Sequence, residues 1–165
     1  MDDVTIREAT PEDVAAVQRV GRKSWHAAHD DILGSDTVER VIDEWYDAKS
    51  IAESISRDDG PFFVASEGND VVGFAHAVLR DDEPAWLSRI YVAPDRWGDG
   101  LGTALLERVE GLLREADADR LRLAVMADNG VANAFYETHG YAVVEERDEE
   151  LFAVTFEEYV REKEL

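Results

Sequence analysis

Residues 90–106 read IYVAPDRWGDGLGTALL, and this stretch decides how the chain is organised. The apolar run that ends at Val92 predicts a β-strand, and the Pro that follows predicts a turn. Gly98, Gly100 and Gly102 occupy every second position and lead into an amphipathic helix. Glycines in such a turn tolerate positive φ and let backbone N–H groups approach a ligand. Because the helix presents free N–H groups and the positive end of its dipole there, we expect an anion such as phosphate or pyrophosphate.

The glycine-rich turn has three other interpretations, of which two fail on spacing. A P-loop requires Gly-Lys-Ser/Thr, which does not follow here. A dinucleotide-binding fingerprint requires a third glycine at position 103, where this chain has Thr103. That fingerprint also belongs to a first βαβ unit, whereas this turn lies past the middle of the chain. A plain tight turn without a ligand stays open on these residues alone.

A second stretch, residues 125–141, reads VMADNGVANAFYETHGY. It predicts the end of a strand, an asparagine turn, a short helix, a glycine stop and a new strand. Together the two stretches resemble the GNAT superfamily of acetyl-CoA-dependent N-acetyltransferases. The family signature Gln/Arg-x-x-Gly-x-Gly/Ala is matched by Trp97-x-x-Gly100-x-Gly102, except at its first position. The family's second motif is matched at every key position, namely Asn129, Ala132, Phe135, Tyr136, Gly140 and Tyr141.

The periodicity of the chain predicts an α+β order of elements in one domain, residues 1–165. We expect strands at residues 4–8, 62–65, 71–79, 85–92, 121–127, 141–146 and 151–156. We expect helices from Thr10, after Gly34, at 102–116 and at 131–138, with a turn or short helix at 50–56. The resemblance implies the GNAT-type fold, a central mixed and mostly antiparallel β-sheet flanked by about four helices.

The resemblance implies a cleft for acetyl-CoA where the fourth strand diverges from the fifth. The backbone of Ile90, Tyr91 and Val92 is then expected to pair with the pantetheine arm like an added strand. The backbone N–H groups expected to hold the pyrophosphate are those of Trp97, Gly98, Asp99, Gly100, Leu101, Gly102 and Thr103. Arg96 is the candidate for a side-chain contact to phosphate, because Trp97 occupies the family's Gln/Arg position. The carboxylate of Asp99 is expected to point to solvent.

Tyr136 is the catalytic residue that the resemblance favours. Attack of an amine on a thioester leaves a thiolate that needs a proton, and a Tyr hydroxyl can supply that proton as a general acid. A core aromatic beside Phe135 is the alternative for Tyr136. Asn129 is expected to bind near the pantetheine, or else to cap the following helix. The family also implies that a backbone N–H near Val92 stabilises the oxyanion.

The general base is not apparent from the sequence. Many family members place a Glu on the fourth strand, at the position of Trp86 here, and no carboxylate lies between Trp86 and Val92. Glu83, in the loop before that strand, is the candidate that we favour, with Asp82 beside it. The other candidates are His26, His29 and His76, because each can titrate near neutrality, although a lone His is more often structural.

Residues 24–29, SWHAAH, resemble the first-helix segment that lines the acceptor pocket in many small-molecule GNAT enzymes. Trp25 and His29 are therefore predicted to bind the acceptor. His76 and Trp86, on the third and fourth expected strands, are predicted to join them. Core packing stays the alternative for Trp25.

The composition is strongly acidic, with 38 Asp and Glu against 17 Lys and Arg and a net charge of −21. Such a surface repels nucleic acid and anionic membranes, so neither is an expected partner. No apolar run reaches the roughly 18–20 residues of a membrane span, and the acidic start does not resemble a signal peptide. The lack of Cys excludes disulfides and thiolate metal sites, and no metal is implied. A cytoplasmic location is expected.

The acidity has two explanations, attraction of a cationic substrate or adaptation of the surface to very high salt. The acids are spread over the whole chain, and Lys23, Lys49 and Lys163 are its only lysines, which favours salt adaptation. At molar salt the Debye length is only about 3 Å, so self-repulsion is screened. We therefore expect the melting temperature to rise steeply with KCl. A thermal melt that is the same in dilute buffer and molar KCl contradicts this prediction.

The sequence thus favours an enzyme that moves an acetyl group from acetyl-CoA to a primary amine of a small molecule by direct attack. Two alternatives stay open: a protein N-terminal or lysine acetyltransferase, and a non-catalytic acyl-CoA-binding regulatory module. The sequence does not specify the acceptor amine. Because many family members are dimers, a homodimer is the expected assembly, although no segment marks an interface.

Overall fold

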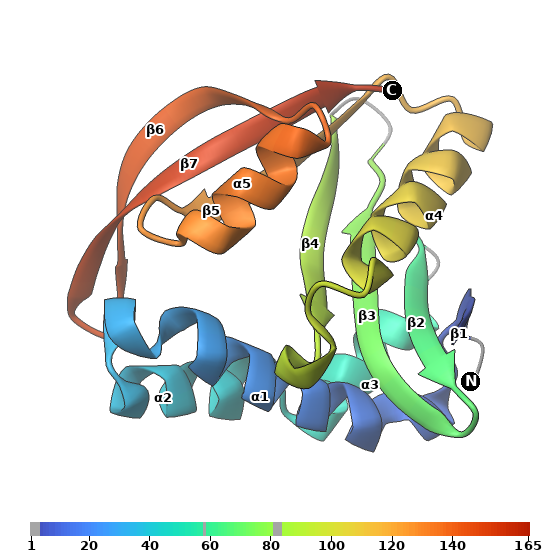
Figure 1. The fold of residues 1–165 in the computed structure, drawn as a ribbon, viewed down its shortest axis with the longest axis horizontal. Helices are drawn as coiled ribbons and strands as arrows, with labels where there is room; N and C mark the ends of the chain where they lie inside the picture. The colour runs from blue at the N-terminus through green and yellow to red at the C-terminus, as the bar shows by residue number, and fades with distance from the viewer. Residues whose placement is uncertain (1–3, 58, 81–83) are drawn as a thin grey trace.

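A mixed β-sheet between two layers of helices positions every other part of the molecule (Figure 1). The computed structural model describes residues 4–57, 59–80 and 84–165. The strands in these residues are β1 (Val4–Glu8), β2 (Phe62–Glu67), β3 (Asp70–Val78), β4 (Ala85–Val92), β5 (Arg120–Met126), β6 (Ala142–Leu151) and β7 (Val154–Glu164). The helices are α1 (Val14–Leu33), α2 (Ser35–Trp45), α3 (Ala48–Ser56), α4 (Leu101–Glu115) and α5 (Gly130–Thr138), with short 3-10 helices η1 (Pro11–Asp13) and η2 (Pro94–Arg96).

The strand order is β1-β2-β3-β4-β5-β7-β6, and only β4 and β5 run parallel to each other. The predicted mixed and mostly antiparallel sheet is therefore confirmed. β4 and β5 pair only at Ala85↔Leu121 and Trp86↔Arg122, and no further pairing joins them. The α4 helix connects the two, as a parallel pair of strands requires. The stretch of β4 from Leu87 to Val92 thus has an edge without a strand partner.

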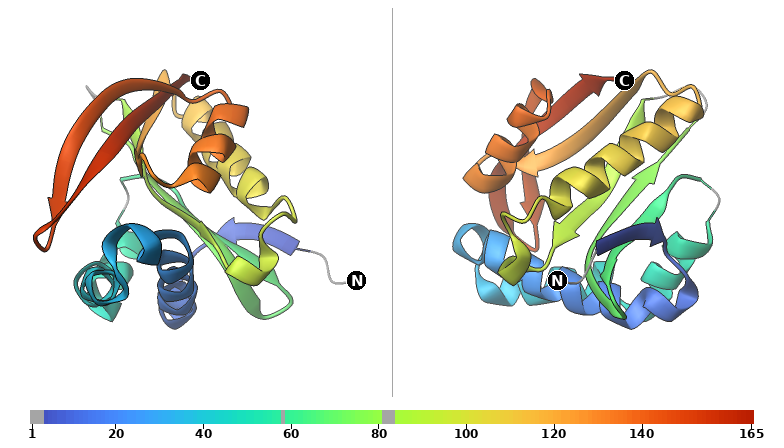
Figure 2. Two further views of the ribbon diagram at one scale, coloured as in Figure 1. Left: turned by 60° about the vertical axis from the view of Figure 1, so that its left-hand side comes forward. Right: turned by 45° about the vertical axis from the view of Figure 1, so that its right-hand side comes forward.

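The sheet separates two hydrophobic cores, with α1, α2 and α3 on one face and α4 and α5 on the other (Figure 2). Side chains of a strand point alternately to its two faces. Phe62 and Val64 of β2 accordingly pack with α1–α3, whereas Phe63 and Ala65 pack with α4 and α5. This double burial explains the continuous apolar run that marks β2 in the sequence.

The final hairpin is longer than the sequence predicts. The expected strands of this hairpin span residues 141–146 and 151–156, whereas β6 continues through residues 147–150 and the chain reverses at Phe152 and Ala153 with φ of 48° and 68°. Two consecutive positive φ angles fit a two-residue hairpin turn that follows the twist of the strands. The Phe152 ring packs against the α1–α3 core, and the Arg40 guanidinium lies 4.2 Å from its centroid. These tertiary contacts place the turn where local composition did not.

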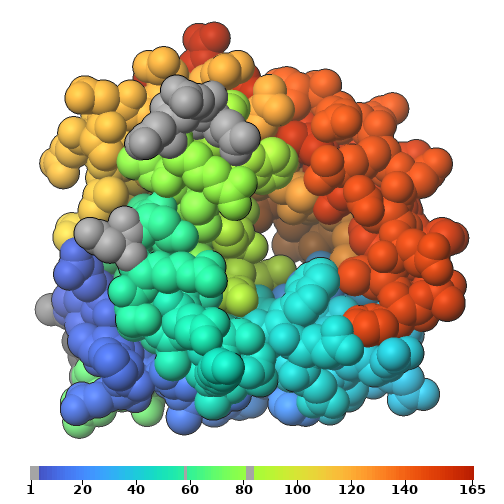
Figure 3. Space-filling view, turned by 180° about the vertical axis from the view of Figure 1, so that it is seen from behind, coloured from blue at the N-terminus to red at the C-terminus, as the bar shows by residue number. Residues whose placement is uncertain are grey.

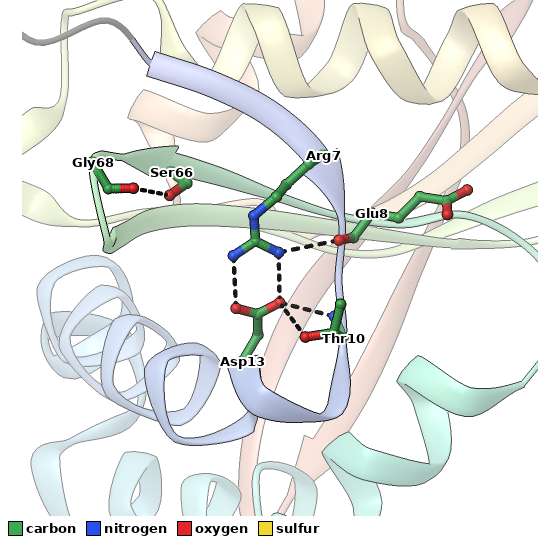
Figure 4. Close-up of polar contacts among 6 residues, drawn as sticks. All are labelled: Arg7, Glu8, Thr10, Asp13, Ser66 and Gly68. Carbon is green, nitrogen blue, oxygen red and sulfur yellow. Dashed lines mark hydrogen bonds and ion pairs between the residues drawn. The ribbon is translucent and has the colours of Figure 1, made fainter.

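An ion pair fixes the start of α1 to β1 (Figure 4). The Arg7 guanidinium donates two hydrogen bonds to the Asp13 carboxylate, of 2.8 and 2.9 Å. The same carboxylate accepts the backbone N–H of Thr10 at 2.8 Å, which completes a capping box at the predicted helix start. The Asp13 side chain is buried, and the hydrogen bond from Arg7 lowers the pKa of its carboxyl.

The Asp13→Asn variant is expected to lose about 2 kcal/mol of stability at neutral pH, because hydrogen bonds to a charged group are removed. A lowered pKa means that this contribution is present above the unfolded Asp value of about 3.9 and is lost as pH falls through the folded value. Chemical unfolding in molar KCl should therefore show the difference from wild type at pH 7 and its decrease toward pH 3. The exposed Glu12→Gln variant is the charge-matched control, and an equal loss in that variant contradicts the prediction.

Candidate active site

The glycine-rich turn between β4 and α4 leaves a row of backbone donors without partners. Gly98 and Gly100 have φ of 86° and 82°, a region that strains residues with a Cβ, and Gly100 is the N-cap of α4. The first backbone hydrogen bond of α4 runs from Ala104 to the Gly100 carbonyl. None of the backbone N–H groups of residues 98–103 donates a hydrogen bond to a described residue. These donors and the helix dipole make the turn suitable for an anion.

Two side chains anchor the end of β4. The Trp97 indole N–H donates to the Val92 carbonyl at 2.8 Å, and the Ser24 hydroxyl of α1 donates to the same oxygen at 3.0 Å. Trp97 occupies the position at which the family pattern has a Gln or Arg. Its indole N–H donates to the protein's own backbone. This contact ties α1 and the turn to the end of the strand.

Arg96 also has partners within the protein. Its Nη2 lies 2.8 Å from Glu67 Oε2, and its Nε lies 3.0 Å from Asp99 Oδ2. Arg96 therefore forms ion pairs with two carboxylates, and its guanidinium has less charge available for the expected contact with a phosphate. The Asp99 side chain is exposed, as predicted, and holds Arg96 against the turn.

A cavity of about 920 Å³ extends from the glycine-rich turn into the gap between β4 and β5. The structure brings most of the predicted site residues to its wall, namely Trp25, His29, Ile90, Tyr91, Val92, Arg96, Trp97, Gly98, Gly100, Leu101, Gly102, Thr103, Asn129 and Tyr136. Asp99, His76 and Trp86 do not line it.

Tyr136 is held in the cavity wall by α5. Its ring packs 5.4 Å from Phe135 and 6.0 Å from Tyr141, centroid to centroid, and the residue is 9% exposed. Its hydroxyl forms no hydrogen bond within the part of the chain that the structure describes. Burial raises the pKa of Tyr136, because it disfavours the phenolate. The hydroxyl therefore stays protonated at neutral pH and is free to donate.

Asn129 and Thr103 border the cavity but have protein partners. The Asn129 side chain accepts the Ala132 N–H at 3.1 Å, so it caps α5 as one of its two expected roles requires. Thr103 Oγ1 lies 3.0 Å from His139 Nε2, and the His139 ring packs 4.6 Å from Phe135. The sequence analysis did not identify this contact of His139, which joins the ends of two helices across 36 residues of sequence.

Trp25 and His29 form an aromatic wall on the α1 side of the cavity. Their ring centroids are 4.2 Å apart, and Trp25 also lies 6.2 Å from Tyr91 and 6.0 Å from Trp45. The Trp25 indole N–H donates to the Tyr46 hydroxyl at 3.1 Å, so its position is fixed. Burial lowers the pKa of His29 to about 4, and this imidazole is therefore neutral near pH 7.

The other predicted residues lie elsewhere. His76 is buried in β3 with its ring 4.9 Å from Phe62, and burial lowers its pKa to about 4. Trp86 belongs to the part of β4 that still pairs with β5, before the cavity opens. Glu83 and Asp82 fall outside the described residues. Within those residues, no group of three or more acidic or His side chains is arranged to hold a metal ion.

Comparison with known proteins agrees with this geometry. A family model described as "Acetyltransferase (GNAT) family" matches residues 25–141. The chain belongs to the GNAT family. It is therefore an acyltransferase enzyme, and acetyl-CoA is its cofactor. None of the helices in the described residues combines the length and apolar character of a membrane span.

Several named members of the family are similar over most of the chain. The spermidine N(1)-acetyltransferase of Thermoplasma acidophilum is 26% identical, over 85% of this chain and 89% of its own. The aminoglycoside N(6')-acetyltransferase type 1 of Stenotrophomonas maltophilia is 27% identical, over 86% and 88%. The crystal structure of PaiA N-acetyltransferase from T. acidophilum in complex with coenzyme A covers 99% of both chains at 25% identity with a TM-score of 0.87.

The cavity wall also includes residues that sequence reasoning missed. They belong to the β6–β7 hairpin, namely Arg147, Glu149, Glu150, Leu151, Phe156 and Glu158. The signal that could have found them is the alternation of Arg147, Glu149 and Leu151, which lies between the expected strands at 141–146 and 151–156.

Proposed function

We propose that this GNAT enzyme transfers the acetyl group of acetyl-CoA to a primary amine of a small molecule by direct attack. One observation carries the proposal: a single cavity is bordered by the glycine-rich turn and by Tyr136, whose N–H groups and hydroxyl have no hydrogen-bond partner among the described residues. The relatives named for spermidine and aminoglycosides support a small-molecule amine as acceptor.

The proposed cofactor contacts follow from the backbone. The N–H groups of residues 98–103, at the N-terminus of α4, would hold the pyrophosphate. The edge of β4 that β5 leaves unpaired would bind the pantetheine arm through Ile90, Tyr91 and Val92. Bound there, acetyl-CoA would supply a thioester, with a carbonyl carbon open to attack by the amine and a thiolate as leaving group.

Tyr136 would donate its hydroxyl proton to the departing sulfur, since burial keeps the phenol protonated. The amine nitrogen must lose a proton as the C–N bond forms. Glu83 remains our proposed acceptor of that proton, and the neutral imidazole of His29 is the candidate within the cavity wall.

We further propose that residues 1–165 act as one domain in the cytoplasm, with a surface adapted to high salt. The lysine-poor acidic composition supports the salt adaptation.

We also propose a homodimer. Its support in the structure is that Val143 and Val144 are 41% and 50% exposed on β6, at the end of the sheet.

The test is release of free CoA thiol from acetyl-CoA in molar KCl with a panel of primary amines. We expect thiol release that depends on a small-molecule amine and an N-acetylated product by mass spectrometry. Tight CoA binding without turnover on any amine would instead favour a regulatory module, and turnover confined to peptide amines would favour a protein acetyltransferase.

A further inference from the structure

The cavity has a second mouth on the side of the molecule away from α4 and α5. Figure 3 shows a hollow there, between segments coloured green, cyan and orange-red. The lining on this side includes Trp45 at the end of α2, Arg89 of β4 and the inner face of the β6–β7 hairpin. A ligand held at the glycine-rich turn therefore leaves a separate entrance for the acceptor.

One face of the β6–β7 hairpin lines this mouth, and its residues change from apolar to charged along the strands. The strand register pairs Arg147 with Glu158 and Glu149 with Phe156, and cross-strand partners share a face. Phe156 packs with the α1–α3 core, so this face points inward. Glu149, opposite Phe156, and the Arg147–Glu158 pair one step further along the strands lie on this face and line the cavity.

Negative charge exceeds positive charge at this mouth. Arg147 Nε lies 2.9 Å from Glu158 Oε2 and 3.3 Å from Glu149 Oε1, so two lining carboxylates share one guanidinium. Asp31 and Glu150 also line the cavity, and neither forms an ion pair with a described residue.

Arg89 is the other cation at this mouth, and it is already engaged. It donates to the Trp45 carbonyl at 3.1 Å and to the Ser54 hydroxyl at 3.3 Å. Its guanidinium lies 5.0 Å from the Tyr46 ring centroid. The lining of the whole cavity therefore includes five acidic residues, Asp31, Asp128, Glu149, Glu150 and Glu158, and three arginines, Arg89, Arg96 and Arg147, each of which has protein partners.

The aromatic wall between the charged mouth and Tyr136 also suits a cation. Trp25 and Trp45 both line the cavity with their ring centroids 6.0 Å apart, and aromatic rings attract ammonium groups. His29 is 5% exposed and lines the cavity, and its Nδ1 has no hydrogen-bond partner among the described residues. A neutral imidazole keeps one nitrogen lone pair and does not repel an ammonium group.

We propose that this mouth selects an acceptor with a second ammonium group, which Glu149 and Glu158 of the hairpin hold while the other amine reaches Tyr136. The inference rests on the proposed function and names the class of its acceptor: diamines and polyamines. The aromatic wall of Trp25 and His29 would cover the chain between the two nitrogens.

The test compares acceptors of equal length that differ only at the far end. The first set is putrescine, n-butylamine and γ-aminobutyrate; the second is hexamethylenediamine, n-hexylamine and ε-aminocaproate. At fixed ionic strength we expect kcat/KM to be highest for a diamine, at least about tenfold above its matched monoamine, and lowest for the amino acid. Equal values for diamine and monoamine, or a preference for the amino acid, would overturn the proposal.

The Glu149→Gln/Glu158→Gln double variant should lose about tenfold in kcat/KM for the diamine, mainly through KM, so that the preference for the diamine over its matched monoamine falls. The control is Glu107→Gln/Glu115→Gln, which removes the same charge from the exposed face of α4. An equal loss in this control would show that total surface charge, and not the hairpin, attracts the diamine.

A binding measurement separates this inference from the proposed function. Each amine is titrated calorimetrically into the protein saturated with CoA. Stronger binding of the diamine than of the monoamine, weakened only by the hairpin variant, supports the inference even if no amine is acetylated. Acetylation of amines without any such preference would overturn the inference and leave the proposed function intact.

Discussion

The Tyr136→Phe variant is expected to lower kcat by about 10²–10⁴-fold, the usual contribution of a general acid, and to leave the Kd for CoA unchanged. The substitution removes a hydroxyl that has no hydrogen-bond partner among the described residues, so the fold loses little. Because burial raises the pKa of Tyr136, wild-type kcat should not fall through loss of this proton up to at least about pH 10, the ordinary Tyr value. Steady-state kinetics and calorimetry with CoA measure the two quantities.

The matched control is Tyr141→Phe, in the same aromatic group. The Tyr141 hydroxyl donates to buried Glu110 at 2.6 Å, and Lys163 Nζ lies 3.0 Å from the same carboxylate oxygen. Loss of this hydroxyl should lower the melting temperature and spare kcat. If Tyr136→Phe keeps wild-type kcat, Tyr136 is a core aromatic and the proposed acid is wrong.

The Gly100→Glu variant is expected to weaken acetyl-CoA binding by about 100-fold or more. Gly100 has φ of 82°, so any Cβ there is strained, and the new carboxylate would lie among the N–H groups proposed to hold the pyrophosphate. No heavy atom lies within 4 Å of the position of an added Cβ, so the variant should fold. Calorimetric titration of acetyl-CoA in molar KCl measures the effect.

Two further variants divide this effect into its causes. Gly100→Ala introduces the backbone strain without the charge and should weaken binding much less. Gly111→Glu places the same charge on α4, at a position that is also open, and should bind as wild type. Unchanged binding by Gly100→Glu would mean that the glycine-rich turn is only a turn, and the proposed cofactor contacts would fall.

The parts of the fold that the sequence predicted are those set by local chemistry. The β4 strand ends where the apolar run ends, and α4 begins after Gly100, because glycine geometry and helix capping act over a few residues. Asn129 caps α5 for the same reason. The alternation of apolar residues likewise predicted most of the sheet.

The structure adds contacts that the local patterns did not predict. His76 has the chemistry of an acceptor ligand, but its ring stacks against Phe62 in the core. Arg96 has the positive charge that a phosphate-binding side chain needs, but its guanidinium forms ion pairs with Glu67 of β2 and with neighbouring Asp99. The hairpin turn at Phe152 depends on packing against α1–α3, which a local pattern of charges does not reveal.

The sequence by itself determined the family, the order of elements and the row of unpaired N–H groups at α4, because strand and helix periodicity and glycine conformation are local properties. Tertiary structure alone decided which side chains face the cavity. The register of β6 on β7 brings Glu149 and Glu158 to a mouth whose opposite wall contains Trp25 of α1. More than 120 residues separate the two walls, and they meet because β4 and β5 stop pairing after Trp86 and leave a gap that only the folded sheet defines.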